Sequence, residues 1–364
     1  MRDFPYEFWL ASIRGIGCKK ISALLKRFHT PECIFCAEEE DIAQVEVLRA
    51  ADVRELAASR NKDYVWERYD ALCRKGISFT WKGREDYPKR LLAIASPPYG
   101  LFYRGSLPDG EMPAVAVVGA RNASHCGREL ARLFGRELAE NGVAVISGLA
   151  RGVDIASQRG VLSVAGGRTY GVLGCGIDQC YPREHIDSYM LMQENGGVIS
   201  EYCPGMPPLV GNFPMRNRII SGLAGGILVI EAGERSGSLI TAEYGMEQGK
   251  DVFVVPGDVG NSAYVGSNRL IKDGAALVTQ TQDILDGLGI FLDEDVSSRK
   301  KKYEVMLETS EKIVYSYLGL EPIHISELVR MSGFSVQRTM ELLIAMELKG
   351  LVKQISGQYY AMIL

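Results

Sequence analysis

Glycine, serine and arginine gather in several short segments in the middle of this chain, and the combination suits the binding of an anion. Backbone N–H groups approach an anion closely beside a glycine, and a guanidinium adds a full charge and paired hydrogen bonds. The segments are 119–124, 147–152, 212–218 and 231–238. The candidate binding residues in them are Gly119, Arg121, Ser147, Gly148, Arg151, Arg216, Asn217, Arg218, Ser236 and Ser238.

Three of these segments lie just after a short, continuously apolar run, and 212–218 follows another such run after the segment 201–205. Runs of this kind are typical of a parallel strand buried on both faces. The predicted strands are 115–118, 143–147, 169–173, 198–200, 227–230 and 252–255, with a weaker one at 277–278 and edge strands at 78–81 and 101–103. The predicted helices are 127–140, 153–164, 185–195, 213–223 and 238–248. This alternation predicts an α/β fold with a Rossmann-like, doubly wound, mostly parallel sheet. Ligands of such sheets bind outside the carboxyl ends of the strands, so we expect the candidate residues to converge there.

Composition divides the chain of 364 residues into three domains and a linker. Residues 1–75 carry helical periodicity without a strand-like run, which predicts a small helical domain. The Rossmann-like domain spans 76–292, and the acidic-then-basic segment 293–305 is a solvated linker. Residues 306–364 give a helix, a helix-turn-helix and a hairpin, which is the order of a winged-helix domain.

The two flanking domains carry patterns that are associated with DNA. The glycine-rich turn around Gly15 and Gly17 resembles a helix-hairpin-helix motif of a SAM-like domain, whose backbone amides can meet a phosphate. A purely structural helical hairpin is the alternative. The last long helix, 336–349, mixes Arg338 with Glu341, so contact with a protein is as consistent with it as contact with DNA.

The overall composition limits the classes of protein to which the chain can belong. A net charge of −4 means that a nucleic-acid site must be a local patch. No apolar stretch approaches the ~20 residues of a membrane helix, and the first residues lack the apolar core of a signal peptide, so we expect a cytoplasmic protein. The eight cysteines show no pairing logic, and the single CxxC, Cys33 to Cys36, has no second pair, so no metal site is expected.

Cofactor binding is disfavoured at the first predicted strand. The dinucleotide fingerprint needs glycines where this chain has Arg121 and Ser124, and the second strand ends in Ser147 instead of a carboxylate that could hold a ribose. No Walker A segment and no G-x-S-x-G elbow occurs. We therefore predict no cofactor.

Catalytic residues are not expected either. The histidines near the candidate face, His125 and His185, are interpreted as helix-surface residues. Three acidic residues near strand ends are interpreted as partners of neighbouring arginines, with a role as acids as the alternative. They are Glu201, Glu231 and Glu243.

The order and spacing of eight motifs resemble the DNA-processing protein A family (DprA/Smf). The motifs are 118–121, 147–154, 181–182, 200–202, 213–220, 236–242, 255–257 and 266–271. They cover roughly residues 85–280, and the flanking domains are of the kind that this family carries. In one departure, Ser157-Gln158 stands where the family usually has Ala-His.

The resemblance implies a dimeric protein of natural transformation (competence) that binds and protects single-stranded DNA and helps to load the RecA recombinase. Phosphates would then be neutralised by Arg121, Arg151, Arg216 and Arg218 and cradled by Gly and Ser amides. Phe213 or Tyr202 could stack on a base, although such residues more often belong to a core.

Two other functions remain open. The segment from Glu231 to Glu243 loosely resembles the Gly-rich loop of nucleotide phosphoribohydrolases of the lysine-decarboxylase-like Rossmann group, but P-G-G-x-G-T is absent. The second alternative is a winged-helix regulator whose Rossmann-like domain senses a nucleotide.

Overall fold

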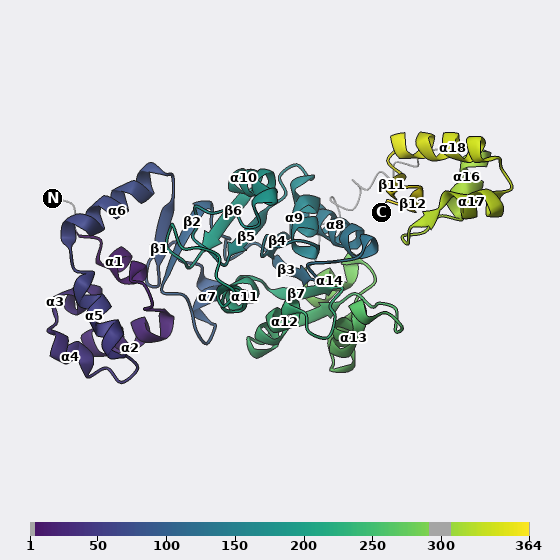
Figure 1. Ribbon diagram of the computed structural model, residues 1–364. Coiled ribbons are helices and arrows are strands. Elements are labelled where there is room, and N and C mark those ends of the chain that lie inside the picture. Colours follow the sequence, from purple (N-terminus) through teal and green to yellow (C-terminus); the bar gives the residue numbers. More distant parts are fainter. Residues whose placement is uncertain (1–3, 291–306, 364) are drawn as a thin grey trace.

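A nine-stranded sheet forms the centre of the protein in a computed structural model that describes residues 4–290 and 307–363 (Figure 1). Its strand order is β1-β2-β6-β5-β4-β3-β7-β8-β9, and β2 runs antiparallel to both of its neighbours, β1 and β6. The predicted α/β, doubly wound, mostly parallel sheet is confirmed. The strands are β1 (Ser78–Trp81), β2 (Gly100–Gly105), β3 (Ala114–Gly119), β4 (Ala144–Ser147), β5 (Thr169–Leu173), β6 (Gly196–Ser200), β7 (Gly226–Ile230), β8 (Asp251–Val254) and β9 (Ala276–Leu277).

Helices cover both faces of the sheet, which explains why its central strands are apolar without alternation. On β3, Val115 and Val117 belong to the core under α8, α9 and α14, whereas Ala116 and Val118 belong to the core under α11, α12 and α13. The helices of this domain are α7 (Lys89–Leu92), α8 (His125–Glu140), α9 (Val153–Leu162), α10 (Ile186–Glu194), α11 (Asn212–Leu223), α12 (Gly237–Glu247), α13 (Val265–Lys272) and α14 (Thr281–Gly287).

The N-terminal region is helical, as predicted, and it packs on the antiparallel edge of the sheet (Figure 1). Phe8 contacts Phe79 of β1 and Phe102 of β2 at ring centroid distances of 5.7 and 6.2 Å. Trp9 is fully buried beside Phe35. The helices are α1 (Tyr6–Ser12), α2 (Cys18–Phe28), α3 (Pro31–Cys36), α4 (Glu39–Ala43), α5 (Ala50–Ala58) and α6 (Lys62–Arg74).

The C-terminal region is a winged-helix domain, as predicted, with a core of its own. Leu328, Leu343 and Val352 are buried in that core. The elements are α16 (Thr309–Ser316), β10 (Ile323–His324), α17 (Ile325–Ser332), α18 (Val336–Leu348), β11 (Val352–Ser356) and β12 (Tyr359–Met362). The predicted linker, 293–305, lies outside the described residues. Within the described residues, no helix is long and apolar enough to cross a membrane.

Candidate functional site

A cavity of about 710 Å³ opens where β3 and β7 lie side by side in the sheet. After β3 the chain turns to α8 on one face, and after β7 it turns to α12 on the other face. This divergence is the topological switch point at which open α/β sheets bind ligands. The cavity is lined by residues of 118–122 and 231–238, by the beginning of α11 and by Ala150, so all four predicted segments meet here.

Close packing of loops fixes the floor of this cavity. A Cβ atom on Gly119 would lie 1.9 Å from the carbonyl oxygen of Ile230, so a side chain does not fit there. Gly152 has a φ of +77°, and its Cβ would lie 2.1 Å from the carbonyl oxygen of Ala120. Gly119 brings the end of β3 against β7, and Gly152 brings the loop after β4 against the loop after β3. These contacts fix where Arg121 begins.

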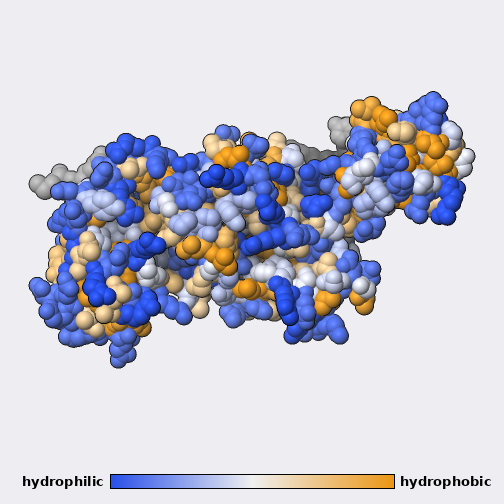
Figure 2. Space-filling model, in the orientation of Figure 1, coloured by the Kyte–Doolittle hydropathy of each residue, from blue (hydrophilic) through white to orange (hydrophobic). Residues whose placement is uncertain are grey.

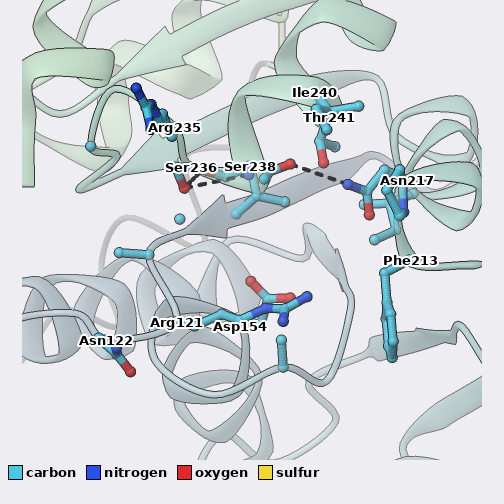
Figure 3. A pocket seen from close by; sticks show the side chains of 18 of the residues that line it. Arg121, Asn122, Asp154, Phe213, Asn217, Arg235, Ser236, Ser238, Ile240 and Thr241 are labelled. Carbon is cyan, nitrogen blue, oxygen red and sulfur yellow. Dashed lines mark hydrogen bonds between the residues drawn. The ribbon is translucent and has the colours of Figure 1, made fainter. Parts of the chain in front are cut away.

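An exposed cation and an aromatic ring face each other across the cavity. The guanidinium carbon of Arg121 lies 5.4 Å from the ring centroid of Phe213, within the range of a cation–π contact. Figure 3 shows Arg121 beside Asp154 on one side, with Phe213 on α11 opposite. Phe213 is half-buried, and Tyr181 lies 5.6 Å from it between ring centroids. A phosphate and a base could therefore be held side by side.

A buried pair of opposite charges lies beneath Phe213. Arg216 is 4% exposed, and its Nη1 donates to the carbonyl oxygens of Gly148, at 2.9 Å, and Val172. Asp154 accepts from the backbone N–H of Gly148 at 3.1 Å. Burial raises the pKa of Asp154, and the charge of Arg216 opposes that rise. Burial lowers the pKa of Arg216, and Asp154 opposes that shift in turn.

The start of α12 forms the wall of the cavity opposite the loop after β3. The hydroxyl of Ser236 caps the helix and lies 2.7 Å from the hydroxyl of Ser238. Asn217 of α11 donates to the carbonyl oxygen of Gly237 at 3.2 Å, so it braces α12 against α11 (Figure 3). Arg235, just before the helix, is exposed and lines the cavity.

Glu231 is bonded to the N-cap residue of a helix and not to an arginine, so its interpretation as the partner of a neighbouring arginine is wrong. Its backbone has a φ of +52°, and its carboxylate accepts from the backbone N–H and the hydroxyl of Ser124 at 2.7 and 2.6 Å. The hydroxyl of Tyr264 lies 3.4 Å away. Ser124 is the N-cap of α8, so Glu231 couples the end of β7 to the beginning of that helix. Glu243 is exposed and has no ion pair within the described ranges.

Arg218 and Tyr202 lie outside this cavity. Residues two apart on a helix point about 200° apart, so Arg216 and Arg218 cannot face the same site. Arg218 instead pairs with Glu201 at 2.7 Å, which confirms that pairing, and lines a second cavity. Tyr202 also lines the second cavity, and burial raises its pKa to about 12.

Three other predictions concern side chains that are buried or already paired within the protein. Ser147 is fully buried, and its hydroxyl donates to the carbonyl oxygen of Val117 at 2.6 Å. Arg151 is exposed but is engaged by Glu184 through hydrogen bonds of 2.7 and 2.8 Å. His185 is only 5% exposed, so its placement on a helix surface is wrong; its Nδ1 lies 2.9 Å from the carbonyl oxygen of Leu149.

Comparison with known proteins identifies the family. Residues 78–289 match the family described as DNA recombination-mediator protein A. The chain belongs to this family. The resemblance seen in the motifs is thereby confirmed, and residues 304–358 match the DprA winged helix domain. The chain is also 38% identical over 282 residues to protein Smf of Escherichia coli, which covers 76% of this chain and 75% of that protein.

Two solved structures of family members resemble this protein. DNA processing protein A from Streptococcus pneumoniae aligns with a TM-score of 0.67 and 33% identity, over 79% of this chain and 98% of that one. DNA processing protein A from Helicobacter pylori, described for its single-stranded DNA binding mode, aligns with a TM-score of 0.53 and 28% identity. That match covers 60% of this chain and 97% of the other.

Sequence reasoning missed several lining residues and left one family departure open. Asn122, Asp154, Arg235 and Thr241 line the cavity. Their positions in the sequence could have identified them, because all but Asp154 lie in or beside the loops that follow β3 and β7. The departure from the usual Ala-His of the family, Ser157-Gln158, is fully buried outside the cavity lining.

Replacing Gly152 by alanine should destabilise the protein more than replacing Gly142. Both glycines have positive φ values, +77° and +72°, so alanine carries backbone strain of about 1 kcal/mol or more at each, and the ψ of −124° at Gly152 lies outside the left-handed region and adds to that strain. Only the Cβ at 152 also meets backbone atoms, because nothing lies within 4 Å at 142. Urea unfolding should show an additional loss of about 1–3 kcal/mol for Gly152→Ala. Equal losses would contradict the close packing of the loops after β3 and β4.

Proposed function

We propose that the protein binds single-stranded DNA in the cavity at the β3–β7 switch point. The observation that carries this proposal is the pairing of Arg121 with Phe213. An exposed guanidinium suits a backbone phosphate, and a partly buried aromatic ring suits a base that has left its stack. Arg235 on the opposite loop supplies a second exposed cation at the same cavity.

The geometry favours a single strand over a duplex. Phe213 lies inside a cavity walled by α12 on one side and the loop after β3 on the other, so a base must be unpaired to reach its ring. Asn217 and Thr241 supply polar groups to the lining of the same cavity, and polar groups in such pockets orient a ligand. The known single-stranded DNA binding mode of the Helicobacter pylori relative supports the same assignment.

The biological setting that we propose follows from the family. A protein of this kind would protect strands during natural transformation, act as a homodimer in the cytoplasm, and help to load a RecA-type recombinase. We propose binding without catalysis, because the carboxylate of Glu231 is engaged by Ser124. This engagement also weighs against the phosphoribohydrolase alternative.

The winged-helix domain fits a protein partner better than DNA. Figure 2 shows hydrophobic surface gathered over α18. Four apolar side chains repeat there at every fourth residue and are 40–85% exposed: Val336, Met340, Ile344 and Leu348. Arg338 is engaged by Glu341 at 3.2 Å. A DNA-reading helix would present free cations, so we propose that single-strand binding resides in the Rossmann-like domain.

The protein should prefer single-stranded to blunt double-stranded oligonucleotides, and its binding should weaken with salt. With phosphate contacts from Arg121 and Arg235, the log–log slope for a short single strand should be about −1.4. Affinity should then fall roughly sevenfold between 50 and 200 mM salt. Fluorescence anisotropy measures both quantities, and equal or tighter binding to duplex would exclude the proposed site.

The substitution Arg121→Ala should weaken binding of a short single strand by about 1–3 kcal/mol, the contribution of a charge-assisted hydrogen bond. The control is Arg269→Ala on α13, which removes the same charge from a side chain that is 76% exposed and outside the cavity lining. The melting temperature of both variants should stay near that of the unmodified protein. If the two variants bind alike, the site must be sought elsewhere.

A further inference from the structure

A second cavity, of about 1130 Å³, lies between the N-terminal helical region and the sheet domain. The turn between α1 and α2 forms one wall, with Arg14, Gly15 and Gly17 among its lining residues. The loop after β6 and the side of α11 that carries Arg218 form the other wall. The function proposed above leaves this cavity unused, as it does the helix-hairpin-helix-like turn.

The start of α2 in this cavity has no cap. Its N-cap residue is Gly17, which supplies no side-chain hydrogen bond, and the first turn contains no acidic residue. The turn begins instead with Cys18 and two lysines. The first N–H groups of a helix lack partners within the helix and carry a partial positive charge. An anion placed beside Gly17 would accept hydrogen bonds from these N–H groups and offset their partial positive charge.

Arg218 is an independent sign of an anion at the same place. Its side chain is 5% exposed, and a single nitrogen, Nη2, donates to both oxygens of Glu201 at 2.8 and 2.7 Å. Nε and Nη1 are buried without a hydrogen-bond partner in the described part of the chain. Buried donors without partners are costly and rare. Nη2 also lies 3.7 Å from the Sγ of Cys18, the first residue of α2, so the guanidinium adjoins the uncapped helix start.

One ridge separates this cavity from the proposed DNA site. Pro208 and Val210 line the first cavity, whereas Pro207 and Leu209 line the second. The start of α11 also contributes to both, and Val210 is 87% exposed at the crest. A polymer that leaves the first cavity across this ridge enters the second, and the apolar crest suits unpaired bases.

We propose that the cavity between α2 and α11 binds a second backbone phosphate of the same DNA strand that occupies the first cavity. This inference rests on the proposed single-strand binding and extends it. The start of α2 and Arg218 hold the phosphate, Arg14 adds an exposed positive charge, and the strand passes over the ridge at Val210. Strands long enough to span both cavities therefore bind more tightly than strands that fill the first alone.

The test uses two substitutions at one position of the full chain. The backbone at Gly17 has a φ of −86°, and nothing lies within 4 Å of a Cβ there, so both side chains fit. Gly17→Asp places a carboxylate where it caps α2 and displaces the phosphate. Gly17→Ala leaves the amides free and adds no charge. Anisotropy is measured with oligothymidylates of about 6 and about 30 nucleotides, chosen to bracket one and several binding subsites.

We expect Gly17→Asp to bind the long strand roughly tenfold more weakly while its affinity for the short strand is unchanged, because one charge-assisted contact is lost. Gly17→Ala should match the unmodified protein with both strands. Unchanged long-strand binding by Gly17→Asp would overturn the inference. So would an equal loss in both variants, or an equal loss for both strand lengths. If the unmodified protein fails to bind even the short strand, the proposed function itself is wrong.

Discussion

The guanidinium of Arg216 is buried beneath the candidate site, where it bonds to carbonyl oxygens at Gly148 after β4 and Val172 of β5. A planar group with five donors can join several loops at once. Its carbon also lies 5.9 Å from the ring centroid of Phe213, so the same side chain supports the ring from below. Asp154 offsets its charge and anchors Gly148. Without this pair, the start of α11 would lose the bonds of Arg216 to Gly148 and Val172, and the ring of Phe213 would lose its support opposite Arg121.

The division between buried and exposed arginines gives the site its chemistry. Arg216 is buried and engaged by the protein, so its geometry is fixed before a ligand arrives. Arg121 and Arg235 are exposed and form no ion pair within the described residues, so their charges can meet a flexible phosphate backbone. Preformed buried supports reduce the ordering cost of binding, and exposed cations make affinity depend on salt. A protein with a net charge of −4 can hold a polyanion in this way through a local concentration of cations.

The sequence was sufficient for the fold because continuous apolar runs mark buried parallel strands; the predicted strand at 169–173 coincides with β5. The positions of the site loops followed from that fold. Individual side chains were harder to place. Because α11 is buried nearly all round, its sequence shows no polar face that would tell which way Arg216 and Arg218 point. Ser147 ends a strand that is buried on both faces, and the burial of His185 depends on a contact with Leu149 that is distant in sequence. Such outcomes depend on tertiary contacts that local patterns do not encode.

Photocrosslinking tests the central claim most directly, because it identifies the residue that an unpaired base contacts. A short oligothymidylate carrying 5-iodouracil would be irradiated in complex with the full chain, and the crosslinked peptide identified by mass spectrometry. The account predicts a crosslink at Phe213 at the start of α11. Crosslinks confined to α18 of the winged-helix domain, with none on α11, would contradict it.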